Sequence, residues 1–174
     1  MATTKGPSRK ELAPQVREVD TGGDYQALLA EVKTHIRSTQ YAALRAVNKA
    51  LVGLYWDIGR LIVERQRDAG WGKAVVAQLA NDLQADFPGT GGFSASNLWR
   101  MKGLFETYRG AEKLAPLVRE IGWSHNLIIL ERCKNAQERE FYLRMTRRFG
   151  WSKNVLAHQI DNQSYEKSLL GQTN

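Results

Sequence analysis

Few residues of this sequence have the type and spacing that active-site chemistry requires. His125 and Cys133 are the candidates for acid–base or nucleophilic work, and Glu31-Val32-Lys33 is a fragment that a metal-dependent nuclease motif would contain. That fragment lies within apolar residues of helical spacing, whereas the nuclease motif needs a strand and a preceding Asp. A Gly-x-Ser-x-Gly segment and a glycine-rich phosphate loop are both missing from the sequence. We therefore expect a chain without catalytic activity of its own.

Metal ions and cofactors are not expected either. A single cysteine excludes an internal disulfide and a multi-cysteine zinc site, and we expect Cys133 to be buried and unreactive. His35, His125 and His158 are too far apart for a helical zinc motif. His125 lies in the first turn of a predicted helix beside Trp123, where a structural hydrogen bond is the expected role. No apolar run reaches the length of a membrane helix, so a cytoplasmic location and no membrane partner are predicted.

Basic residues are concentrated in one part of the chain. The 174 residues carry a net charge of +7, and residues 93–153 contain 12 Lys or Arg against 6 Asp or Glu. A local basic excess on a folded segment is typical of a phosphate-binding surface. The alternative is a solvated face that keeps the protein soluble.

The N-terminal part is expected to be a flexible leader followed by a long helical segment. Residues 1–23 contain proline, glycine and scattered charges without a period, and Asp24 has the side chain of a helix N-cap. Apolar spacing then predicts one long helix, or two with a break near Ser38. Its second half contains a seam with steps of 3 and 4 residues: Leu44, Val47, Leu51, Leu54, Ile58 and Leu61. The seam fits packing within a bundle, which is our preferred interpretation, or a homodimer interface.

Three aromatic–serine pairs predict where later helices begin. Phe93-Ser94, Trp123-Ser124 and Trp151-Ser152 each combine a capping hydroxyl with an aromatic residue that can pack on the first turn. With a helix ending near Phe87, these signals predict helices at about 94–108, 124–133, 136–149 and 152–168, and a short turn near 113–119. Strand-like alternation is missing. We predict an all-α helical bundle that forms a single domain over residues 24–170.

Residues 72–108 resemble a helix-turn-helix unit. The second helix has a predicted buried stripe of Leu98, Met101, Phe105 and Tyr108, and a polar face of Ser96, Asn97, Arg100 and Lys102. In helix-turn-helix motifs this part of the second helix enters the major groove, where Asn can read adenine and Arg guanine. The alternative is an ordinary polar face, with Asn97 assisting the helix cap.

A second basic cluster lies further along the chain. It contains Arg139, Arg144, Arg147, Arg148 and Lys153, of which Arg144, Arg147 and Lys153 are the predicted phosphate contacts. Arg147 and Arg148 can also complement the C-terminal dipole of their helix.

Several motifs, in order, resemble the N-terminal domain of the bacterial YhcG family over about residues 25–170. They are Tyr55-Trp56-x-Ile58-Gly59-Arg60, Gly70-Trp71-Gly72, Phe87-Pro88-Gly89, Gly92-Phe93-Ser94-x-x-Asn97-Leu98-Trp99-x-Met101, Trp123-Ser124-His125-Asn126, Glu138-Arg139-Glu140-Phe141-Tyr142 and Gly150-Trp151-Ser152-x-Asn154-Val155-Leu156. The resemblance implies a helical domain that is followed in the family by a nuclease of the PD-(D/E)xK class. Residues 171–174 would then begin the connector, and the nuclease residues have no counterpart here.

These observations lead to two functional hypotheses. The first is a DNA-targeting domain for an attached or partner nuclease, with Ser96, Asn97, Arg100 and Lys102 facing DNA. The second is a protein–protein interaction module that dimerises through Leu44, Val47, Leu51, Leu54 and Ile58. DNA and RNA are not distinguished by the sequence.

Overall fold

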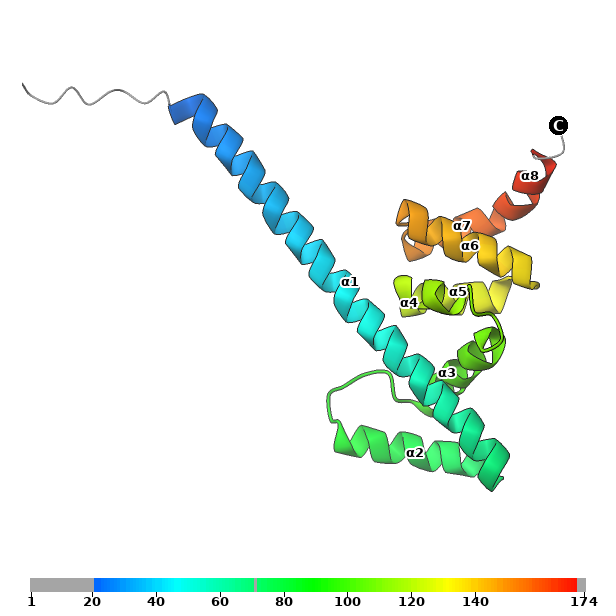
Figure 1. Ribbon diagram of the computed structural model, residues 1–174. Helices are drawn as coiled ribbons and strands as arrows, with labels where there is room; N and C mark the ends of the chain where they lie inside the picture. Colours follow the sequence, from blue (N-terminus) through cyan, green and yellow to red (C-terminus); the bar gives the residue numbers. More distant parts are fainter. Residues whose placement is uncertain (1–20, 71, 172–174) are drawn as a thin grey trace, which may run out of the picture. The chain divides into compact units, whose positions relative to one another are not determined.

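The computed structural model describes residues 21–70 and 72–171, and within them eight α-helices and no strand (Figure 1). The predicted leader, up to residue 20, lies outside the described residues, as does the connector beyond residue 171. The helices are α1 (Thr21–Ala69), α2 (Lys73–Asp86), α3 (Ala95–Tyr108), α4 (Ala115–Glu120), α5 (Trp123–Arg132), α6 (Ala136–Phe149), α7 (Lys153–Asp161) and α8 (Ser164–Leu170). The chain divides into two units, residues 1–41 and 42–174, and the second unit contains the core. The all-α prediction is confirmed.

Helix α1 is one continuous helix of 49 residues, without a break near Ser38. The Ser38 hydroxyl donates to the carbonyl of His35 (2.9 Å), and the Thr34 hydroxyl donates to that of Ala30 (2.8 Å). These side chains bond back to the helix that contains them, so they do not interrupt it. The helix begins at Thr21, and Asp24 lies in its first turn, where a carboxylate complements the helix dipole.

The apolar seam of α1 does not form the core, so the preferred bundle interpretation is wrong for most of it. Leu44 is 70% exposed and Leu54 is 46% exposed, and Val47, Leu51 and Leu61 are exposed as well. Ile58 alone in the seam is half-buried and packs on a core cluster. The buried face of α1 is a different one, formed by Val52, Tyr55, Trp56, Gly59 and Ile62.

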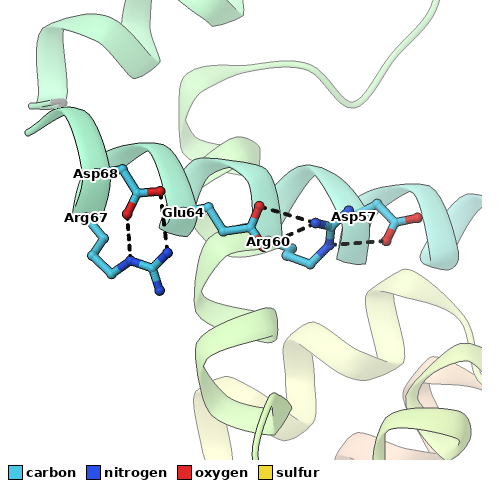
Figure 2. A network of polar contacts seen from close by, with 5 residues as sticks. All are labelled: Asp57, Arg60, Glu64, Arg67 and Asp68. Carbon is cyan, nitrogen blue, oxygen red and sulfur yellow. Dashed lines mark hydrogen bonds and ion pairs between the residues drawn. The ribbon is translucent and has the colours of Figure 1, made fainter.

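The C-terminal third of α1 also carries a row of charged side chains (Figure 2). Arg60 lies 3.1 Å from the carboxylate of Glu64 and 3.9 Å from that of Asp57, and Arg67 pairs with Asp68. The two pairs of Arg60, at i,i+3 and i,i+4, are partly exposed, and pairs of this kind contribute only about 0.3–0.5 kcal/mol each to a helix. Their main effect is to keep this side of α1 polar.

Two clusters of buried side chains form the core of the second unit. One cluster joins α1, α2 and α3 through residues such as Tyr55, Val76 and Leu98, and the other joins α1 to α3–α7. At Gly59 the backbone of α1 approaches the carbonyl group of Met101 on α3 so closely that a Cβ would overlap it. Glycine is therefore required at this position, as expected for a helical glycine where another backbone comes close.

The buried stripe of α3 differs from the prediction at one position. Leu98, Met101 and Tyr108 are buried as predicted, but Leu104 takes the fourth buried place and Phe105 is only half-buried. Phe105 instead packs edge-on against Trp56 at 5.2 Å between ring centroids.

Two of the three predicted serine caps are confirmed, and one is wrong. Ser94 accepts from the Asn97 backbone N–H, and Ser152 accepts from that of Val155, both over 3.3 Å. Ser124 is not a cap, because α5 begins one residue earlier, with Gly122 as its N-cap. The side-chain amide of Asn126 donates to the carbonyls of Gly122 (3.2 Å) and Val118 (2.9 Å), which ties the helix start to α4.

The helix predicted over residues 152–168 is two helices. Gln163 adopts a left-handed conformation with φ of 52°, and it separates α7 from α8. The Tyr142 hydroxyl donates to the Gln159 carbonyl and accepts from the Tyr165 N–H, each over 3.2 Å. The buried Tyr142 hydroxyl thus bonds to the backbone on both sides of the break and stabilises the turn between α7 and α8. The apolar spacing of residues 152–168 does not reveal this turn, because Tyr142 belongs to another helix.

Candidate nucleic-acid interface

An open groove lined with arginines lies between α1, α4 and α6. Its volume is about 540 Å³, and its lining consists of Arg45, Leu117, Arg144, Met145, Arg147 and Arg148. Three of the arginines come from the last two turns of α6, where Arg147 and Arg148 also complement the helix dipole. Arg45 comes from α1, far away in the sequence. The groove is therefore a product of the tertiary fold.

A carboxylate outside the groove lining partly neutralises Arg45, one of the lining residues. Glu120, at the end of α4, accepts from Lys49 Nζ (2.5 Å) and Arg45 Nη2 (2.9 Å). The hydrogen bond from Lys49, followed by that from Arg45, lowers the pKa of the Glu120 carboxyl. Two cations thus share one anion, and the three side chains together keep a net positive charge next to the groove.

The opposite side of the groove is formed by one face of α6. Arg144 Nε donates to Glu140 Oε1 (2.7 Å) within the same helix, and Arg144 Nη2 lies 2.6 Å from that oxygen in the same ion pair. Arg147 is exposed and has no hydrogen bond or ion pair within residues 21–70 and 72–171. Its guanidinium is consequently free to meet an anion from solution.

Two aromatic rings lie beside Arg148, at the end of α6. The Arg148 guanidinium is 5.2 Å from the centroid of the Phe149 ring. The Phe149 ring stacks on that of Trp151 at a centroid distance of 5.9 Å and an interplanar angle of 19°. Gly150, with φ of 61°, makes the left-handed turn between the two rings.

On α3, Asn97 has a structural role. Its amide nitrogen donates to the Gly92 carbonyl (2.6 Å), and its amide oxygen accepts from the Trp123 indole N–H (3.0 Å). Both ends of the amide are therefore engaged, and reading a base would require these bonds to break.

The other predicted residues of α3 have weaker contacts. Ser96 is exposed, with its hydroxyl 3.2 Å from that of Ser94. Arg100 is exposed, and its Nε lies 3.9 Å from Glu131. The Lys102 side chain is 22% exposed, lies over the Trp99 ring at 5.2 Å, and is 3.5 Å from Glu106. Of this set, Ser96 and Arg100 have the most freedom to contact a ligand.

The structure brings Arg144 and Arg147 together in one groove and leaves the other predicted contacts out of its lining. Lys153 is exposed at the start of α7 but does not line the groove. Arg45 was not predicted. The available signal was the basic pair Arg45 and Lys49, one turn apart on a single helix, but only the fold places this pair opposite α6.

Neither residue that sequence reasoning considered for chemistry is arranged for it. His125 Nε2 donates to the Trp151 carbonyl over 2.9 Å, and burial lowers the pKa of the imidazole. Cys133 is buried, and burial, followed by the Glu138 carboxylate, raises the pKa of its thiol to about 12. The thiolate that nucleophilic chemistry needs is therefore scarce near neutral pH.

Neither a metal-binding cluster nor a membrane span is found in the part of the chain that the structure describes. Within residues 21–70 and 72–171, no three His, Cys, Asp or Glu side chains gather as a metal site would require. Among the described helices, none combines the length and apolar composition of a membrane span.

Comparison with known proteins gives two matches that agree with each other. The model of the DUF1016 N-terminal domain family matches residues 31–167. A curated protein of Escherichia coli (strain K12), named "Putative nuclease YhcG", is 28% identical over 182 aligned residues, which cover 86% of this chain and 48% of that protein. The chain thus spans about half the length of this relative. No solved structure gives a significant match.

Proposed function

The chain belongs to the DUF1016 N-terminal domain family, and we propose that it is a nucleic-acid-binding domain that targets a nuclease to DNA. The observation that carries the proposal is the groove in which Arg45, Arg144, Arg147 and Arg148 converge from two helices. Guanidinium groups are well suited to phosphate because they donate two parallel hydrogen bonds. Several of them in one open groove favour a repeated anionic ligand, such as a sugar–phosphate backbone.

The polar face of α3 is the second part of the proposal. Arg100 and Ser96 are exposed near the start of a capped helix that packs against α2. Arg100 is the candidate for contact with a base edge, and Lys153 is a further candidate for contact with phosphate. Asn97 and Lys102 then act by positioning α3, because their side chains are already engaged.

The proposed task follows from the relative's name and length. The matching Escherichia coli protein carries the word nuclease in its name and is about twice as long as the matched region. We propose that this helical domain binds nucleic acid while another domain or partner cuts it. In this proposal the present chain provides the affinity for nucleic acid and brings the nuclease to it, and it contributes no catalytic residue.

The test is fluorescence anisotropy with a labelled duplex of random sequence, measured over a series of salt concentrations. Affinity should fall steeply with salt, and Arg147→Ala should lower the slope of log K against log salt by about 1. Arg67→Ala is the matched control, because Arg67 is an exposed arginine far from the groove and already paired with Asp68. Equal slopes for both variants, or no binding at low salt, would contradict the proposal.

A second candidate function is assembly through the seam of α1. Leu44, Val47, Leu51 and Leu54 expose large apolar side chains at a spacing that suits a second helix. Sedimentation of the wild type and of a Leu44→Lys, Leu51→Lys variant tests it. A dimer that the double variant abolishes is the expected result, with Leu170→Lys, at a residue 73% exposed, as the control. A wild type that stays monomeric at high concentration excludes this candidate.

A further inference from the structure

We propose that the basic groove binds single-stranded nucleic acid, with an unpaired base stacked on the Phe149 ring. This inference rests on the proposed nucleic-acid binding and deepens it by naming the form of the strand. It starts from the ring of Phe149, which is exposed and does not belong to either core cluster.

Phe149 is 57% exposed although it belongs to a helix whose other aromatic residues pack inward. Tyr142 is fully buried, and Phe141 lies half-buried between Tyr142 and Tyr165. Phe149 instead points its ring along the surface, against Trp151. A large apolar ring left in water at the edge of a charged groove indicates a ligand that has both a flat face and a negative charge.

The ring is held in place from behind. Trp151 is half-buried against the main core, and its carbonyl accepts from His125 Nε2 over 2.9 Å. The left-handed turn at Gly150 then brings the Phe149 ring nearly parallel to the indole, at 19°. A ring that is already oriented loses little conformational freedom when a base stacks on it, so more of the stacking energy appears as affinity.

Cationic groups adjoin the ring on the groove side. Arg148 lies over Phe149 and also lines the groove, together with Arg144, Arg147 and Arg45. Arg148 is exposed, so its guanidinium can turn from the ring to a phosphate when a base takes its place. The phosphates on either side of that base then lie within the groove.

This combination selects unpaired strands. Proteins that bind single strands pair a positively charged groove with aromatic rings, because every unpaired base offers a flat face. Inside a duplex each base already stacks on both neighbours, so an internal base has no face available to Phe149. A duplex can still contact the arginines through its phosphates, but it gains nothing from the ring.

The experiment compares an end-labelled oligothymidylate of about 12 nucleotides with a blunt duplex of similar length, by anisotropy at fixed salt. Wild-type protein should bind the single strand more tightly. Phe149→Ala should weaken single-strand binding by about 5- to 150-fold, which is the range found for the loss of one stacked base, and should leave duplex binding unchanged. Phe149→Trp, which retains a flat ring, should restore the affinity.

Phe87→Ala is the matched control, because Phe87 is 52% exposed, contacts another aromatic ring, and lies away from the groove. If Phe149→Ala behaves like Phe87→Ala, or if the duplex binds as tightly as the single strand, the inference is wrong while nucleic-acid binding stands. If neither probe binds, the proposed function fails and this inference fails with it. Thermal melting of each variant verifies that it is folded.

Discussion

The side-chain amide of Asn97 on α3 holds the indole of Trp123 at the start of α5, with 3.0 Å between Asn97 Oδ1 and Trp123 Nε1. The same amide donates to the Gly92 carbonyl in the loop before α3. One side chain thus connects the α2–α3 loop to the start of α5. Trp123 in turn packs edge-on against Tyr55 of α1.

Replacement of Asn97 should therefore reduce stability. Asn97→Ala leaves the Gly92 carbonyl and the Trp123 N–H without their partners, at an expected cost of about 1–3 kcal/mol in the free energy of unfolding. Urea denaturation measures this cost. Ser96→Ala, at the exposed neighbouring position, is the control and should change stability by less than about 0.5 kcal/mol. A stable Asn97→Ala protein that binds nucleic acid poorly would instead support base reading by Asn97.

The close approach of α1 and α3 at Gly59 gives a second prediction. A Cβ at residue 59 would overlap the Met101 carbonyl, which is backbone and cannot turn away, so Gly59→Ala should destabilise the fold by about 1–3 kcal/mol. Gly53 lies in the same helix, and apart from its own helix backbone nothing lies within 4 Å of the place that its Cβ would take, so Gly53→Ala should stabilise the fold by about 0.5–1 kcal/mol. If Gly59→Ala lowers the melting temperature and Gly53→Ala raises it, the close contact between α1 and α3 is supported. Shifts of the melting temperature in the same direction for both variants would contradict it.

The Glu120 carboxylate predicts a dependence of stability on pH. Its pKa is lower in the folded protein because Lys49 and Arg45 donate to it, so its contribution is present above the unfolded pKa of about 4.3 and is lost as pH falls through the folded value. Because Arg45 and Lys49 are largely exposed, the contribution of their ion pairs with Glu120 should not exceed about 1 kcal/mol. The difference in unfolding free energy between wild type and Glu120→Gln should therefore be present at neutral pH and vanish in acid.

The same substitution should act on ligand binding in the opposite direction. Glu120→Gln releases Arg45 and Lys49 from their shared carboxylate, which should raise the affinity for nucleic acid and steepen its salt dependence by about 1. Asp161→Asn is the control, since it removes an equal charge from an exposed pair with Arg132, outside the groove lining. If both variants change the affinity equally, net charge and not the groove would account for binding.

The buried thiol predicts slow modification. Because the pKa of Cys133 is raised to about 12 and its side chain is buried, a disulfide reagent should label the folded protein far more slowly than the protein in denaturant. Absorbance at a fixed reagent concentration follows the reaction. Rapid labelling of the folded protein would show that α5 and α6 open readily around this residue.

Most elements of the second unit were predictable because their determinants are local. The serine hydroxyls at residues 94 and 152 bond to N–H groups three residues later, and the helices there begin as predicted. Ser124 has the same local sequence and fails as a cap. The deciding contacts at that helix start are the bonds of Asn126 to the preceding helix α4, which spacing alone does not reveal.

The seam of α1 shows why the sequence does not predict which face of a helix is buried. Helical spacing identified the apolar residues from Leu44 to Leu61 but could not tell which side of the helix the rest of the chain would cover. The covered side is that of Val52, Trp56 and Gly59, where the backbone of α3 comes into contact with α1 at Gly59.

By itself, the sequence determined the all-α class, the helical character of α1, the serine caps of α3 and α7 and the basic excess of residues 93–153, since each depends on neighbouring residues. Only the tertiary structure placed Arg45 opposite Arg144 and Arg147, engaged Asn97 with Trp123, and left Phe149 exposed beside Arg148. The physical reason is that a groove is the space between helices. Its lining depends on their crossing points, which the packing of side chains distant in sequence decides.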